Sequence, residues 1–337
     1  MATNPWEIYD LLIERAHAVL SESDNPEPKI RQVIIGLTWT LCLNDADGIG
    51  LCMSPGQYTR TLPWSGTLVG RPLKEMFSWV KSWNPFEAAV GLAAINSVIN
   101  PNTLGVTAQA VPIHGSGAQN LAVFDFFLPR LKNKKVAVVG RYPGLEQYES
   151  TVNLTVLERA PQGYDYPDPA CEYILRDMDW VFLTANSIAN KTFTRLAELC
   201  RDSVTVLMGP SMPWMEDWLE YGIDFLAGVQ VSHVQALLAT VAEGGGVNIF
   251  EYGVQYQVLD LSQNEMQCLK TNIADLVAKR EQLKTEMDAW YGQRDVGSGK
   301  LSRFPKRHVL EQIDKELSLL DLRFKRQWDA RHAVARG

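Results

Sequence analysis

The 337-residue sequence has no run of about 18 uninterrupted apolar residues and no charged-then-apolar leader, which argues against a membrane span and against secretion. Its five cysteines are scattered, and no two form a C-x-x-C pair, so neither a zinc knuckle nor a disulfide framework is indicated. The signatures H-E-x-x-H and G-x-S-x-G are missing as well, which removes the usual marks of a zinc protease and of a serine nucleophile. We therefore expect a cytoplasmic protein whose thiols are free and buried.

Positive charge is scarce in most of the chain. The 269 residues before Lys270 carry 17 Lys and Arg against 29 Asp and Glu, whereas the residues from Lys270 onward carry 15 against 10. The acidic balance of the long first part argues against nucleic acid as a partner. The reversal of sign indicates an appended C-terminal module with a role of its own.

The first 105 residues have the pattern of a small α+β domain. "PWEIYDLLIERAHAVL" has the i, i+3, i+4 spacing of an amphipathic helix, and "QVIIGLTWTLCL" alternates as one β-strand that turns at "NDADGIG" into "IGLCMSP". Two helices, "RPLKEMFSWVKSW" and "NPFEAAVGLAAINSVIN", follow. In the second, Asn84 is the expected N-cap, Pro85 the first helical residue and Glu87 the partner that completes a capping box.

Residues 106–258 have the pattern of a doubly wound parallel sheet. After a Gly- and Pro-containing linker, continuous apolar runs alternate with helical segments, which is typical of strands covered on both faces. The predicted strands are "KVAVVG", "NLTVLERAP", "WVFLTA", "SVTVLMGPS" and "FLAGVQV". The helix "HVQALLATVAEG" closes the predicted series.

Residues 259–337 are predicted to form an antiparallel helical hairpin. Apolar residues follow a heptad spacing from Met266 to Trp290 and again from Leu310 to Phe324, on either side of the loop "GQRDVGSGKLSRFP". Ser262 and Glu265 form a capping box at the start. The apolar stripe is narrow, so we expect it to bind a partner, which could be the main body, a second copy or another protein.

Ligands of open α/β sheets bind beyond the carboxyl ends of the strands, so we collect the polar and glycine residues found there. Arg141 could hold an anionic group, Glu158 a hydroxyl or a cation, and Ser211 a fixed hydrogen bond. Asn96 of the first domain and His114 of the linker would approach the ligand from the other side. The candidate ligand-binding residues are Gly140, Arg141, Glu158, Thr184, Asn190, Gly209, Pro210, Ser211, Asn96 and His114.

The turn "GRYPGL" does not match the dinucleotide pattern G-x-G-x-x-G. Glu158 follows Gly140 by 18 residues, as an acid that binds ribose hydroxyls would, but Arg141 and Pro143 occupy positions where a pyrophosphate requires glycine. A ribose-bearing or pterin-like ligand, or an anion on Arg141, stays open. A nucleotide-dependent oxidoreductase is the weaker alternative.

Metal ligation has only scattered candidates in the sequence. His114, Cys52 and Cys171 could each ligate a metal, but none stands at a diagnostic spacing. The sequence therefore assigns no metal ligand, no cofactor and no catalytic residue.

Several motifs in order carry a family resemblance: "GLAAINSVIN", "VAVVGRYPGL", "LTVLERAP", "YPDPACEYIL", "LTANSIANKTFTRLAEL", "VLMGPSMPW" and "YGIDFLAGVQV". Together they resemble the heavy-metal chelation family, in which the Rossmann-like domain of unknown function 364 follows an enolase-N-terminal-like companion, domain 4213. The resemblance covers residues from about 5 to 250 and implies a ligand site in the cleft between the two domains.

These observations support three hypotheses. The first is a cytoplasmic protein that binds a small ligand or metal complex in heavy-metal or metallocofactor handling, with catalysis left open. The second is an assembly adaptor that holds a metalloenzyme through the C-terminal hairpin. The third is the oxidoreductase. We expect no nucleic acid and no membrane among the partners.

Overall fold

The computed structural model describes residues 4–101, 106–292 and 303–331. The chain forms two compact units, Met1–Leu261 and Ser262–Gly337, each with its own internal packing. No helix in the described ranges combines the length and the apolar character that a bilayer crossing requires.

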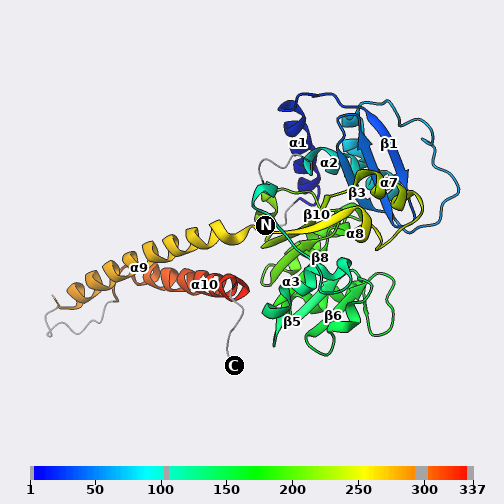
Figure 1. The fold of residues 1–337 in the computed structure, drawn as a ribbon. Coiled ribbons are helices and arrows are strands. Elements are labelled where there is room, and N and C mark those ends of the chain that lie inside the picture. Colours follow the sequence, from blue (N-terminus) through cyan, green and yellow to red (C-terminus); the bar gives the residue numbers. More distant parts are fainter. Residues whose placement is uncertain (1–3, 102–105, 293–302, 332–337) are drawn as a thin grey trace. The chain divides into compact units, whose positions relative to one another are not determined.

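The N-terminal lobe (residues 4–101) places helices α1 and α2 against a three-stranded antiparallel sheet in the order β1-β2-β3 (Figure 1). The prediction of one long strand across residues 32–43 is wrong. The chain makes a tight turn at Gly36, whose amide donates to the Trp39 carbonyl oxygen at 2.9 Å. The elements are α1 (Glu7–Ser21), β1 (Ile30–Ile35), β2 (Trp39–Asn44), β3 (Ile49–Met53), the 3-10 helix η1 (Leu73–Lys81) and α2 (Pro85–Ile99).

Helix α2 is the centre of this lobe, because its residues from Ala88 to Ile99 are all buried. The Asn84 side chain accepts a hydrogen bond from the Phe86 amide at 3.0 Å, which confirms the predicted N-cap. The capping box is indirect: Glu87 accepts a hydrogen bond from the Ser82 hydroxyl, which in turn accepts one from the Asn84 amide. Gly50 of β3 meets the helix so closely that a Cβ would lie 2.0 Å from the Ala93 carbonyl oxygen.

The larger sheet has eight strands in the order β4-β11-β10-β9-β8-β5-β6-β7. The strands from β10 to β7 in this order are parallel, as predicted for a doubly wound sheet. Three strands were not predicted from the sequence: β7 pairs parallel with β6, β11 pairs antiparallel with β10, and β4 pairs antiparallel with β11. The strands are β4 (Val111–Pro112), β5 (Lys135–Val139), β6 (Asn153–Glu158), β7 (Tyr166–Pro167), β8 (Trp180–Thr184), β9 (Val204–Met208), β10 (Phe225–Val231) and β11 (Val254–Asp260).

The connecting helices differ in length and in what they cover. Helix α3 (Ala122–Leu131) covers an aromatic cluster in which Phe127 packs on Trp180 and Phe182. On the other side of the sheet, one hydrophobic core continues from strands β5, β8 and β9 into α1 and α2 of the N-terminal lobe. The shorter helices are α4 (Cys171–Ile174), α5 (Asn186–Ala189), α6 (Phe193–Leu199), α7 (Val234–Ala242) and α8 (Ile249–Tyr252).

Helix α7 and the loop after it return from the large sheet to the small one. Helix α7 packs against β1 and β2, and a Cβ on Gly36 would lie 2.4 Å from the Val241 carbonyl oxygen. The Trp39 indole N–H donates to the Gly246 carbonyl oxygen at 2.8 Å. Residues 234–246 therefore complete the packing of the N-terminal lobe.

The C-terminal unit is a hairpin of α9 (Ser262–Gly292) and α10 (Arg307–Arg331), as predicted. Arg280 pairs with Asp314 at 2.5 Å, and Lys306 with Glu286 at 2.7 Å, so the helices run antiparallel. Most of the predicted heptad residues are only half-buried, with Leu269 and Ile313 as buried exceptions. The Glu265 side chain and most of the predicted loop lie outside the described residues.

Candidate functional site

The structure has an open hollow beyond the carboxyl ends of strands β5 and β6. Its volume is about 480 Å³, and it is lined by the last residue of β6 and by the segments that follow the two strands. Its charged lining consists of Arg141, Glu146 and Glu158. The other lining residues are Pro143, Gly144, Ala160 and Gln162.

Glu158 ends β6 and is held by the main chain. Its Oε2 accepts a hydrogen bond from the Arg141 amide at 2.7 Å, and its Oε1 accepts one from the Ala160 amide at 3.2 Å. Each carboxylate oxygen can accept a second hydrogen bond. Two main-chain donors thus fix this carboxylate at the edge of the hollow and leave it acceptor capacity for a ligand.

The Arg141 guanidinium is already neutralised by acidic side chains. Its Nη1 lies 2.5 Å from Asp165 Oδ1, and its Nη2 lies 3.6 Å from Glu146 Oε2. Asp165 is almost completely buried, with 4% of its side chain exposed, whereas 29% of the Arg141 side chain is exposed. Together, Arg141, Asp165 and the two glutamates of the lining therefore carry one positive and three negative charges.

The turn after β5 uses two glycines with positive φ, at 95° for Gly140 and 90° for Gly144. A Cβ on Gly140 would lie 3.0 Å from the Thr184 side chain. Gly144 precedes η4 (Leu145–Tyr148), a single short turn of 3-10 helix. This geometry brings Arg141 and Glu158 together, as predicted, and Thr184 next to Gly140.

Thr184 and Gly209 adjoin the hydroxyl of Tyr142 rather than the hollow. The Tyr142 ring packs edge-on against Phe124 with centroids 5.5 Å apart, and its hydroxyl lies 3.5 Å from the position a Cβ on Gly209 would take. Burial raises the pKa of Tyr142, and a hydrogen bond with Thr184 opposes this. The Tyr142 side chain thus occupies the space beyond the carboxyl ends of β8 and β9.

Ser211 and Asn96 meet in a seam that joins the N-terminal lobe to the loop after β9. The Ser211 hydroxyl accepts a hydrogen bond from the Met53 amide at 2.9 Å. Asn96 Nδ2 donates to the carbonyl oxygens of Leu51 and Ser211, at 2.9 and 3.0 Å. Both side chains are buried, and Asn96 Oδ1 is buried without a hydrogen-bond partner. The sequence placed these two residues on opposite sides of one cleft, and they are in direct contact.

Lys191, which follows the predicted site residue Asn190 and was not itself predicted, lies at the same seam. Asn190 makes local bonds, since its Oδ1 accepts from the amide and the hydroxyl of Thr192. Lys191 has a φ of 69°, donates to the Ala189 carbonyl oxygen at 2.9 Å and lies 5.5 Å from the centre of the Tyr9 ring. Burial lowers its pKa to about 8, although Cys52 nearby opposes the shift.

Lys191 should make the stability of the protein depend on pH. The unfolded chain keeps the ordinary lysine pKa near 10.5, so the folded state binds fewer protons between about pH 8 and 10.5, and stability rises with pH there. Relative to Lys191→Met, we expect the wild-type unfolding free energy to gain about 1–2 kcal/mol from pH 7 to pH 10, after solvent screening. Urea unfolding of both proteins at each pH measures this, and an unchanged difference would contradict it.

His114 and Pro210 lie apart from the hollow. His114 Nε2 is 3.0 Å from Gln255 Nε2, which places His114 beside β11. Strand β11 lies near the opposite edge of the sheet from β6. Pro210 is buried between Gly209 and Ser211. Of the ten predicted residues, only Arg141 and Glu158 line the hollow.

The described cysteines are poorly suited to hold a soft metal ion. Burial raises the pKa of Cys42, Cys52 and Cys171 to about 12, and it raises the pKa of Cys200 as well. A metal is bound by the thiolate, and burial disfavours the charged thiolate at these positions. Within the part of the chain that the structure describes, no group of three or more His, Cys, Asp or Glu side chains is placed to hold a metal ion.

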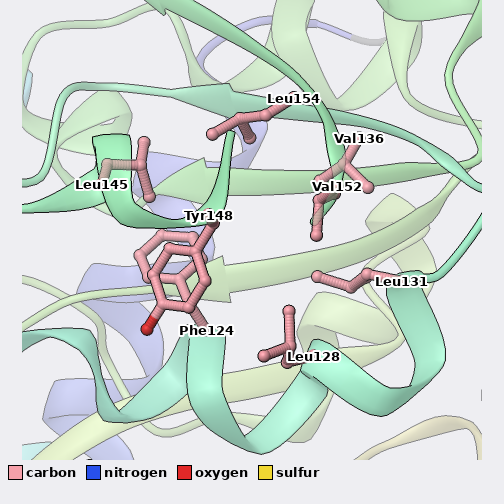
Figure 2. A pocket seen from close by; sticks show the side chains of 8 residues that line it. All are labelled: Phe124, Leu128, Leu131, Val136, Leu145, Tyr148, Val152 and Leu154. Atoms are coloured by element: carbon pink, nitrogen blue, oxygen red, sulfur yellow. The ribbon is translucent and has the colours of Figure 1, made fainter. Parts of the chain in front are cut away.

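A second, much smaller space lies between α3 and the strands β5 and β6. Figure 2 shows its lining, which is apolar except for the Tyr148 hydroxyl, and its volume is about 10 Å³. The Tyr148 hydroxyl donates to Asp125 Oδ1 at 2.6 Å. A space this small and apolar holds no ligand and is a packing gap.

Comparison with known proteins agrees with the predicted family. Two family models match the chain, DUF4213 at residues 18–99 and DUF364 at residues 122–260, and both are described as "Putative heavy-metal chelation". A crystal structure of a DUF364-family protein of unknown function from Desulfitobacterium hafniense DCB-2 is 33% identical, with a TM-score of 0.64 over 76% of this chain and 98% of that one. This chain belongs to the DUF364 family.

A second solved structure shares the fold of this DUF364 protein. It is a DUF364-family protein of unknown function from Pyrococcus horikoshii, 20% identical, with a TM-score of 0.59 over 75% of this chain and 99% of that one. No curated protein matches the sequence. Helices α9 and α10 lie beyond the residues that the two family models match.

Proposed function

We propose that this DUF364 protein binds a small ligand or metal complex in the hollow formed by the loops after β5 and β6, as a step in heavy-metal handling. The observation that carries the proposal is the hollow itself, about 480 Å³ in volume and lined by a carboxylate that two main-chain amides hold in place. Pockets for small ligands have volumes of about 300–1,000 Å³ and a few well-positioned polar groups.

The side chains favour a metal that arrives with an organic ligand over a bare heavy-metal ion. Soft metals select thiolates, and the described thiols are buried and belong to no group of three or more side chains placed to hold a metal ion. Glu146 and Glu158 can accept hydrogen bonds from an organic ligand or supply oxygen donors at the edge of a complex. This extends the chelation described for the matching family models to a specific place in this chain.

The charge around the hollow changes the role we expect for Arg141. We predicted from the sequence that it would hold an anion, but Asp165 and Glu146 already pair with it. The local excess of negative charge favours neutral or positively charged ligands. It also disfavours the phosphorylated cofactor that a nucleotide-dependent oxidoreductase would need.

Mass measurement of the intact protein tests the proposal. We expect native mass spectrometry and elemental analysis of anaerobically purified protein to show one small molecule per chain, with a metal in stoichiometric amount. Both should be lost from the double variant Glu146→Gln/Glu158→Gln, because it removes both acidic acceptors from the lining.

Glu149→Gln is the matched control, since Glu149 is exposed next to η4 and does not line the hollow. It should retain the bound mass. A protein that purifies empty, or a double variant that keeps its ligand, would overturn the proposal.

The hairpin supports a second role in binding a protein partner or another copy. Leu319 and Leu322 of α10 are each 60% exposed, and much of the heptad seam is half-buried, so apolar surface is left to cover. Two helices alone bury little of the apolar surface along their heptad residues. Binding of a protein partner or a second copy would therefore stabilise the hairpin. The same native mass measurement reports a dimer or a co-purifying protein directly.

A further inference from the structure

The hollow contains an acid placed like the one that binds ribose in a nucleotide site, but it lacks the features that bind the phosphates. In dinucleotide-binding sheets, an acid at the end of the second strand accepts hydrogen bonds from the ribose hydroxyls. Glu158 ends β6, which lies directly beside β5 in the sheet, and follows Gly140 by 18 residues. Its carboxylate is held from behind by the amides of Arg141 and Ala160, so its orientation is set before any ligand binds.

The part of the site that would receive phosphates is acidic instead. A pyrophosphate is normally bound by the glycine-rich turn after the first strand and the N-terminus of the helix that follows. Here that turn leads into the four-residue η4, and Glu146 in it lines the hollow. Arg141 could attract a phosphate, but its Nη1 is bonded to the buried Asp165.

We propose that the hollow binds an unphosphorylated ligand that has a vicinal diol, such as a nucleoside. This ligand is neutral or positively charged. This specifies the ligand class of the site proposed above and rests on that proposal. The two adjacent hydroxyls donate to the oxygens of Glu158. The negative surroundings of Glu146 and Glu158 favour a cationic substituent and repel a phosphate.

The test uses the intact wild-type chain and compares ligands by isothermal titration calorimetry at low ionic strength, where charge effects are least screened. Adenosine provides the diol, 2′-deoxyadenosine and 3′-deoxyadenosine each lack one hydroxyl, 5′-AMP adds a phosphate, and S-adenosylmethionine adds a positive charge. We expect about tenfold weaker binding of each deoxynucleoside and of 5′-AMP, and binding of S-adenosylmethionine at least as tight as that of adenosine.

Glu158→Gln should remove the preference for the intact diol, and Glu149→Gln should keep it. If Glu158→Gln does not fold, the comparison of ligands on the wild-type protein still decides the question. Equal binding of adenosine and its deoxy analogues, tighter binding of 5′-AMP, or no binding of any of these compounds overturns the inference. The proposed function is tested separately by native mass spectrometry and elemental analysis, and it fails if the protein purifies empty or if the Glu146→Gln/Glu158→Gln variant keeps its ligand.

Discussion

Replacing Gly50 by alanine is expected to destabilise the protein by about 3 kcal/mol or more, or to prevent folding. The added Cβ would lie 2.0 Å from the Ala93 carbonyl oxygen and 2.3 Å from the Ser97 amide nitrogen, both of them main-chain atoms of the buried helix α2. A side chain could rotate away, but a buried helix must move as a whole, and overpacking of this kind is costly.

Urea unfolding of the intact chain, followed by circular dichroism, measures the effect of Gly50→Ala. Gly117→Ala is the matched control, because Gly117 has a negative φ and no atom within 4 Å of its would-be Cβ. That variant should change stability by a few tenths of a kcal/mol. A Gly50→Ala protein as stable as the control would show that β3 does not approach α2 this closely.

Asn96→Ala is expected to cost about 2–4 kcal/mol of unfolding free energy. The substitution removes the amide group that donates to the carbonyl oxygens of Leu51 and Ser211. Both oxygens stay buried and lose this hydrogen bond. It also opens a cavity where the side chain is completely buried. Because one carbonyl belongs to the N-terminal lobe and the other to the loop after β9, the loss loosens the seam between them.

The comparison variant is Asn153→Ala, at the exposed start of β6, which should remain close to the wild type. Thermal and urea unfolding of both variants give the difference. A cost below about 1 kcal/mol for Asn96→Ala would mean that water or a shift of the main chain satisfies the two carbonyl groups.

The elements that obey a local rule were predictable from the sequence. The N-cap at Asn84, the parallel strands as apolar runs and the two helices of the C-terminal hairpin each depend on neighbours along the chain, and the structure confirms them. That Arg141 and Glu158 lie close together was also predictable, since the ends of adjacent parallel strands meet at one edge of the sheet, and the Arg141 amide donates to the Glu158 carboxylate. The prediction failed at Gly36, where the apolar alternation continues through a turn.

Properties that depend on distant contacts were not predictable. Asp165 stands in an acidic run that looks like a solvated loop, yet it is buried against Arg141. Lys191 lies within one of the family motifs, but nothing in the sequence marks it as buried, and its lowered pKa results from burial against residues such as Tyr9 that come from other elements. The strand β11 was missed because its polar glutamines interrupt the apolar run expected of a buried strand.

The return of helix α7 to the small sheet has a consequence for how this architecture can be inherited. The family model that matches residues 122–260 includes the segment that covers β1 and β2, which belong to the region matched by the other model. A chain that kept only residues 18–99 would expose part of its small sheet to water, and one that kept only residues 122–260 would leave uncovered the face of α7 that packs on β1 and β2. Gene fission or loss that separated the two regions should therefore cost stability, whatever chemistry the pair performs.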